Sequence, residues 1–168
     1  GVTNDGFTKR LIWGDYDGDR WPDIYVGNLT SPNRLYRNEG NGRFRDVALL
    51  VGVTRPSATF PCWFWDYDND AVLDICAFAY GGDIADTAAG YLGLPFQSEL
   101  PCLYHGDGKG GFTEVGRQCN LKKPLHRMGD NFDDLDGDGY LDFYLGTGDP
   151  DYSNLMPNIM YRNRRGES

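Results

Sequence analysis

The sequence predicts an all-β fold built from about three repeats of a four-stranded antiparallel unit. Three observations support it: an aspartate motif occurs three times, short apolar segments flank each copy, and glycine-rich turns follow the first two copies. The 168 residues include 23 glycines and are 14% aromatic, which favours strands and tight turns over helices. A repeat of this kind indicates the architecture more strongly than local propensity does.

The repeated motif reads D-x-D-x-D-x-x-x-D and places four aspartates in nine residues. Its copies span residues 15–23, 66–74 and 134–142, and they begin 51 and 68 residues apart. Carboxylates this close repel one another unless a cation lies among them. Calcium accepts six to eight oxygen ligands in a flexible loop, whereas magnesium demands a stricter octahedron. The three copies therefore predict up to three calcium sites.

Each motif joins two short apolar or aromatic segments, which indicates strand, metal loop, strand. A third strand is predicted after each copy, over residues 33–38, 102–105 and 158–163. Glycine turns over 39–42 and 107–111 lead to a fourth strand over 43–47 and 111–115. The third unit has no fourth strand. An insert over 81–101 lengthens the second unit, and residues 84–92 within it are predicted to form one short helix.

Four-stranded units of this length are typical of β-propeller blades, and a closed propeller needs about four to eight of them. We expect a single repeat domain over 1–168, with blade one at about 8–50, blade two at about 58–118 and an incomplete blade three at about 128–168. Three blades leave an open edge that invites strand pairing. The chain is therefore expected either to be a segment of a longer propeller or to close by self-association, for instance as two copies.

The charge pattern excludes several classes of partner. The formal net charge is −9, and twelve of the 21 aspartates lie in the three motifs. Nucleic-acid binding needs a basic patch, and anionic membranes attract basic segments, so neither partner is expected. No apolar run approaches the roughly 20 residues that a membrane span needs.

The four cysteines, Cys62, Cys76, Cys102 and Cys119, follow neither a C-x-x-C nor a zinc-site spacing. Cys62 and Cys76 flank one predicted hairpin, and Cys102 and Cys119 flank the next. Disulfides Cys62–Cys76 and Cys102–Cys119 are therefore plausible in an oxidising compartment. Four buried thiols are the alternative.

The motif loops with their flanking strands resemble the FG-GAP (VCBS-type) repeats of integrin-like β-propellers. Four segments resemble in particular the family that carries ASPIC/UnbV domains and is related to cartilage acidic protein: residues 33–38 (NRLYRN), 61–70 (PCWFWDYDND), 140–149 (YLDFYLGTGD) and 153–163 (SNLMPNIMYRN). The resemblance covers almost the whole chain. It implies a secreted or cell-surface, calcium-stabilised propeller with a ligand-binding, adhesion or scaffold role, and we expect a secreted or periplasmic protein. No ASPIC/UnbV domain itself is recognised in these residues.

The resemblance also implies a ligand set. In such loops the side chains at motif positions 1, 3, 5 and 9 bind calcium, together with the backbone carbonyl of position 7. The corresponding residues are Asp15, Asp17, Asp19, Trp21, Asp23, Asp66, Asp68, Asp70, Val72, Asp74, Asp134, Asp136, Asp138, Tyr140 and Asp142. The family prefers glycine at position 6, where this chain has Arg20, Ala71 and Gly139. Only the third loop matches fully, which makes it the best-supported site and the second loop the least supported.

Two other interpretations of the loops are weaker. An EF-hand needs flanking helices and an acidic residue at position 12, where this chain has Val26, Ala77 and Leu145. Solvated acidic turns that bind no metal would not be expected to recur three times at matched positions. We favour calcium with a structural role.

Catalysis is not expected, and no catalytic residue is assigned. The sequence contains no G-x-S-x-G, H-E-x-x-H or P-loop motif. His105 occupies the third-strand position that Arg37 and Arg162 hold in the other units, which indicates a surface strand residue. His126 lies in a Lys/Pro-rich connector. Paired carboxylates for glycoside hydrolysis stay an alternative because aspartates are abundant.

A lectin-like or protein-binding propeller is a third class, and its protein or glycan ligand is not identified by the sequence. Exposed aromatics would favour it, and the candidates are Trp21, Tyr91 and Tyr152; packing between blades is their alternative role. A related alternative is that the chain is an accessory part of a secreted enzyme that acts on glycans. The sequon Asn28-Leu29-Thr30 could carry a glycan in a secreted eukaryotic protein.

Overall fold

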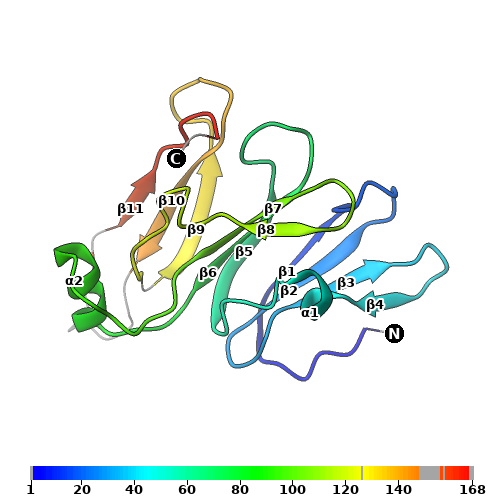
Figure 1. Ribbon diagram of the computed structural model, residues 1–168, viewed down its shortest axis with the longest axis horizontal. Helices are drawn as coiled ribbons and strands as arrows, with labels where there is room; N and C mark the ends of the chain where they lie inside the picture. The colour runs from blue at the N-terminus through cyan, green and yellow to red at the C-terminus, as the bar shows by residue number, and fades with distance from the viewer. Residues whose placement is uncertain (1, 126, 148–155, 157, 167–168) are drawn as a thin grey trace.

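The protein consists of three antiparallel sheets arranged in a row, as seen in a computed structural model (Figure 1). The structure describes residues 2–125, 127–147, 156 and 158–166. The all-β prediction is confirmed at the level of three antiparallel sheets of three or four strands. The sheets form an open row, and the two ends of the chain lie on opposite sides of it in Figure 1. None of the described helices has the length and apolar character needed to cross a bilayer.

Consecutive strands are neighbours in every sheet. The first sheet contains β1 (Thr8–Gly14), β2 (Asp23–Asn28), β3 (Arg34–Asn38) and β4 (Phe44–Asp46). The second contains β5 (Thr59–Trp65), β6 (Asp74–Ala79), β7 (Cys102–Gly106) and β8 (Phe112–Glu114). The third contains β9 (Arg127–Asp133), β10 (Asp142–Thr147) and β11 (Ile159–Tyr161).

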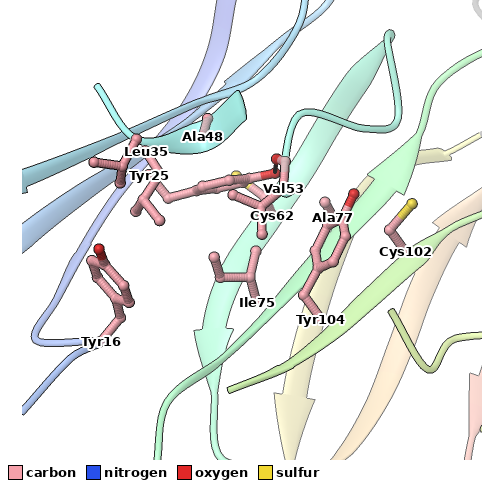
Figure 2. Packing of buried hydrophobic residues seen from close by; sticks show 11 residues of the cluster. Tyr16, Tyr25, Leu35, Ala48, Val53, Cys62, Ile75, Ala77, Cys102 and Tyr104 are labelled. Carbon is pink, nitrogen blue, oxygen red and sulfur yellow. Dashed lines mark hydrogen bonds between the residues drawn. The ribbon is translucent and has the colours of Figure 1, made fainter. Parts of the chain in front are cut away.

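The second sheet is covered on both faces, so its strands contribute to two hydrophobic cores. One face packs against the first sheet through Ile75, Ala77 and Tyr104, which meet Tyr25 and Leu35 (Figure 2). The opposite face packs against the third sheet in a second cluster of buried side chains, which includes Trp63, Phe78, Phe143 and Leu145. A strand buried on both faces is expected to be apolar throughout. The sequence of β6, DICAFA, is apolar after its first residue, and every residue in it is buried.

The second core is rich in aromatic contacts. Trp63 stacks on Phe78 with ring centroids 5.0 Å apart, and Phe143 stacks on Tyr161 at 4.9 Å. Trp65 meets Phe143 edge-on at 5.5 Å. Offset-stacked and edge-on pairs add to the stabilisation that burial itself provides. The Trp65–Phe143 contact joins the second sheet to the third, whereas each stacked pair lies within one sheet.

The outward faces of the two end sheets keep large apolar side chains in contact with solvent. On the third sheet and its first loop these are Leu135, Tyr144 and Met160, between 42% and 58% exposed. On the first sheet Leu11 and Trp13 are 45% and 58% exposed. Clusters of exposed apolar residues are typical of surfaces that meet another partner.

The helix predicted over residues 84–92 forms as α2 (Ile84–Leu92), within the segment that joins β6 to β7. Its N-cap is Asp83, whose carboxylate accepts a 2.8 Å hydrogen bond from the Asp86 amide. It ends at Gly93, whose φ of 71° is the left-handed conformation common at helix C-termini. A second helix, α1 (Ala48–Val51), was not expected, because four residues are too few to show helical periodicity.

The two disulfides considered from the sequence do not form, and all four cysteines keep their thiols. Strand pairing supplies the reason. Cys62 pairs with Ala77 and Cys76 pairs with Trp63, so Cys62 faces the first core and Cys76 the second. Cys102 lies in the first core, whereas Cys119 packs against the second. Burial raises the pKa of the Cys62 thiol to about 12, which makes it a poor nucleophile.

The first core contains one polar anchor that should contribute measurably to stability. The fully buried Tyr25 hydroxyl donates to the Val53 carbonyl at 3.0 Å and accepts from Asn33 Nδ2 at 3.0 Å. Tyr25→Phe would leave the Val53 carbonyl without its partner, and we expect the free energy of unfolding to fall by about 1–3 kcal/mol. Urea denaturation measures this change. Tyr144→Phe, on the exposed outward face, is the matched control and should change stability by less than about 0.5 kcal/mol. Equal effects of the two substitutions would contradict this assignment.

Candidate metal-binding loops

The three aspartate motifs occupy equivalent places in the three sheets. Residues 15–23 (the first loop) join β1 to β2, residues 66–74 (the second loop) join β5 to β6, and residues 134–142 (the third loop) join β9 to β10. All three loops lie along the same edge of the row of sheets (Figure 1). Strands flank every loop, so the helix–loop–helix geometry of an EF-hand is ruled out.

The position-1 aspartates shape the loops through backbone hydrogen bonds. In each loop this carboxylate accepts hydrogen bonds from the amides of positions 5 and 6, at 2.8–3.1 Å. The position-5 carboxylate accepts from the amide of position 7 at 2.9, 2.8 and 3.1 Å in the first, second and third loops. The carboxylates are thus turned toward the inside of the turn, where the carboxylate oxygens gather.

The position-9 aspartates, Asp23, Asp74 and Asp142, are buried, with exposed fractions of 0%, 0% and 2%. One oxygen of each accepts from the position-2 amide of its own loop, at 3.2, 3.0 and 3.2 Å. The other oxygen accepts from an amide just at or beyond the end of the third strand, at 2.7, 2.9 and 2.7 Å. Each position-9 aspartate therefore ties its loop to the third strand of the same sheet.

Burial has an electrostatic consequence for two of these aspartates. It raises the pKa of Asp23 and of Asp74 to about 6 in each case, although backbone hydrogen bonds partly oppose the rise. A buried carboxylate that accepts two amide hydrogen bonds is still costly to keep ionised unless positive charge lies nearby. A cation in the loop would provide that charge.

The predicted ligands come together only in part. Oxygens of positions 1, 3 and 5 lie within 4.8 Å of one another in the first loop (Asp15, Asp17, Asp19) and in the second (Asp66, Asp68, Asp70). In the third loop the group consists of positions 1, 3 and 9: Asp134, Asp136 and Asp142. Asp74 groups instead with Asp68 and His105. Asp23 and Asp138 are in none of these groups among the described residues, and the amides of Trp21, Val72 and Tyr140 donate to the position-5 carboxylates.

The departures from glycine at position 6 leave the backbone conformation unchanged. Arg20 and Ala71 adopt φ values of 73° and 67°, in the same left-handed region as Gly139 at 88°. Position 4 is also left-handed in all three loops. This conformation costs a residue with a side chain about 1–2 kcal/mol relative to the right-handed one. The first two loops therefore keep the loop shape at a conformational cost that the third avoids.

A cationic or imidazole side chain from the third strand, or just beyond it, contacts the position-3 carboxylate in each sheet. Arg37 Nε lies 2.6 Å from Asp17 Oδ2, and Arg162 pairs with Asp136 in the same way. His105 takes this place in the second sheet, so its role as a plain surface residue needs correction. The motif did not reveal these partners, although the alignment of the third strands placed all three residues at one position.

Neighbouring sheets also cover the first two loops. The first loop packs against the second sheet through Tyr16, which stacks on Phe112 with ring centroids 5.5 Å apart. At the second loop, Asn163 Nδ2 donates to the Tyr67 carbonyl at 2.7 Å. The third loop is more open than the first at motif position 2, where Tyr16 is 3% exposed and Leu135 is 52% exposed.

The remaining candidates from the sequence fall in different places. Trp21 and Tyr91 are 50% and 49% exposed, so neither is packed between sheets. Tyr152 and His126 lie outside the described residues. Asn28 is completely buried, and its Nδ2 donates to Asn4 and to the Pro32 carbonyl at 3.0 and 2.9 Å. The expectation that this sequon could carry a glycan is therefore wrong for the folded chain, because the acceptor nitrogen is inaccessible.

The left-handed residues generate a paired prediction. Ala71→Gly removes the steric cost at position 6 of the second loop and should raise the free energy of unfolding by about 0.5–1 kcal/mol. The gain is smaller than the steric cost itself, because glycine has more freedom in the unfolded chain. Gly139→Ala is the mirror substitution, and a Cβ there meets no atom within 4 Å, so only the backbone is strained. It should lower stability by about 1 kcal/mol. Urea denaturation in the presence of a chelator checks both signs, and a loss of stability in Ala71→Gly would refute the explanation.

Comparison with known proteins identifies relatives of these loops. Residues 15–77 match the family described as FG-GAP-like repeat. Cartilage acidic protein 1 of Mus musculus is 30% identical over 165 residues, which cover 95% of this chain and 23% of the mouse protein. The human protein of the same name is 29% identical over 163 residues, covering 94% of the chain and 22% of the human protein. The chain thus spans less than a quarter of these relatives. Residues 15–77 thus match an FG-GAP-like repeat, and nearly the whole chain is similar to part of cartilage acidic protein 1.

Proposed function

We propose that this chain is a calcium-stabilised segment of an FG-GAP propeller, with a structural or ligand-binding role and no catalytic one. One observation carries the proposal: three loops with the same aspartate spacing share one hydrogen-bond pattern and one set of left-handed residues. The FG-GAP-like match and the relationship to cartilage acidic protein 1 support a non-catalytic module.

The proposed calcium ligands are the carboxylates of motif positions 1, 3, 5 and 9 and the carbonyl of position 7 in each loop. Oxygen-only ligands in a flexible turn suit calcium, which tolerates six to eight ligands at irregular angles. The third-strand residues neutralise the loop carboxylates only in part, since Arg37 reaches two of the four carboxylates of the first loop. Calcium would supply the remaining positive charge. Its binding to the folded state alone would stabilise the fold by mass action.

We place the protein outside the cell or in the periplasm. Extracellular calcium is close to millimolar, so even sites with dissociation constants of about 10⁻⁴–10⁻³ M would be occupied there. The relatives named for cartilage favour the same setting. The cysteines contribute nothing to this assignment, because they form neither of the expected disulfides.

In this proposal each sheet corresponds to a propeller blade: the first at about 8–50, the second at about 58–118 with its insert over 81–101, and the third, incomplete, at about 128–168. The exposed apolar faces of the end sheets would then meet further blades. Those blades would come from a longer chain or from a second copy. The ligand would be a protein or a glycan, and Trp21, which is exposed in the first loop, supports carbohydrate binding as the alternative role.

Calcium binding can be measured directly. Calorimetric titration of chelator-stripped protein should show uptake approaching three calcium ions per chain, a higher melting temperature and little response to magnesium. Asp138→Asn removes one carboxylate from the third loop and should reduce uptake by about one ion.

Asp5→Asn makes the same charge change outside the loops and is the matched control, which should bind calcium like the unaltered chain. An absence of calcium uptake, with an unchanged melting temperature, would reduce the loops to acidic turns. Equal uptake by Asp138→Asn and Asp5→Asn would show that calcium binds elsewhere.

The open ends generate a separate prediction. The isolated chain should self-associate through its exposed end faces, and Tyr144→Glu, which places a charge on the outward face of β10, should weaken that association. Tyr91→Glu in α2 has a similar exposure on a different element and should leave association unchanged. Light scattering over a range of concentrations measures both. A monodisperse monomer at all concentrations would show that closure requires blades from elsewhere.

A further inference from the structure

The second loop has a different chemical environment from the other two. In the first and third sheets an arginine, Arg37 or Arg162, contacts the position-3 carboxylate. In the second sheet the equivalent residue is His105, whose Nδ1 lies 3.1 Å from Asp74 Oδ1 and 3.7 Å from Asp68 Oδ2. An arginine can only donate hydrogen bonds, whereas a neutral imidazole nitrogen can also bind a metal ion.

The second loop also contains a buried oxygen whose interactions are incomplete. Asp68 Oδ1 is inaccessible to solvent, and no hydrogen-bond donor among the described residues reaches it. The turn after β11 covers this aspartate, because a Cβ on Gly166 would lie 2.5 Å from Asp68 Cβ. A buried carboxylate oxygen without a donor is destabilising unless a cation satisfies it.

The other two members of the group are held in fixed positions. Asp74 is completely buried, and it accepts amide hydrogen bonds from Tyr67 and Gly106 at 3.0 and 2.9 Å. His105 belongs to β7 and packs edge-on against the Tyr67 ring, with centroids 5.8 Å apart. Its side chain remains 33% exposed, which leaves room for water as a further ligand.

The spacing suits a small divalent ion. Two ligands each about 2.0–2.2 Å from one metal at a tetrahedral angle lie about 3.4 Å apart. The 3.7 Å distance from His105 Nδ1 to Asp68 Oδ2, the oxygen beside the donor-less Oδ1, is close to this value. The 3.1 Å contact with Asp74 Oδ1 is a hydrogen bond, which a bound metal ion would replace. One imidazole with two carboxylates is a donor set that zinc and related transition metals accept, whereas calcium selects oxygen donors.

We propose that Asp68, Asp74 and His105 form a centre for a transition-metal ion of the zinc class, distinct in selectivity from the first and third loops. The inference rests on the proposed function for its view of the second loop as a cation site. The centre shares Asp68 and Asp74 with the proposed calcium ligands, so the two ions compete for the second loop. The chain would then hold two kinds of metal along one edge.

The test is a zinc titration of the chelator-stripped chain in calcium near millimolar, with cobalt as a spectroscopic substitute. We expect one zinc ion per chain, a visible cobalt absorption band, and a fall of about one in the number of calcium ions bound. His105→Arg recreates the arginine of the other two sheets, and we expect it to weaken zinc binding at least about tenfold and to abolish the cobalt band. His105→Gln provides a second variant if the arginine disturbs folding, which circular dichroism checks.

His126→Gln removes the only other histidine in the sequence and should bind zinc normally. Equal zinc affinity in the unaltered chain and in folded His105→Arg or His105→Gln would overturn the proposal, as would a loss of zinc binding in His126→Gln alone. Calcium uptake approaching three ions without His105-dependent zinc binding would refute this inference and leave the proposed function standing. Zinc binding through His105 without calcium uptake would do the reverse.

Discussion

The buried aspartate at the end of each motif is the constraint on which the rest of the structure depends. It starts the second strand of its sheet, and its two oxygens join the loop amide at position 2 to an amide at the end of the third strand. One side chain thereby ties the loop and the second and third strands together. The cost is a carboxylate removed from water, which requires compensating positive charge. A fold that repeats this arrangement three times is well suited to metal binding at each repeat.

Each of the first two loops is also covered by residues of the repeat that follows it. The first loop is covered by the second sheet through Tyr16 and Phe112, and the second loop is covered by the turn after β11 near Asp68. The third loop has no corresponding cover among the described residues, and Leu135 there is exposed. The environment of each loop is thus set partly by the following repeat. The same loop sequence can therefore differ in accessibility and in electrostatics along one chain.

Much of this organisation could be predicted because it is encoded locally. Alternating apolar segments and glycine turns specify the strands, and the aspartate spacing specifies the loops between them. The register between strands, which decides the face of the sheet that each side chain points to, could not be predicted from local sequence. The hairpin positions of Cys62 and Cys76 therefore suggested a disulfide, but the register places the two side chains on opposite faces. The buried state of Asn28 and the contact of His105 with Asp68 depend on residues distant in the sequence. The short α1 carries too few residues to produce a periodic signal.

A crystal structure of the chain grown in calcium, with the ion identified by its anomalous scattering, would test the central claim most directly. The account predicts an ion in the first and third loops, surrounded by carboxylate oxygens and the position-7 carbonyl at about 2.3–2.6 Å. The buried position-9 aspartates should keep both amide hydrogen bonds or exchange one for the ion. Loops that contain only water, with the carboxylates still bonded to the backbone as they are here, would contradict it.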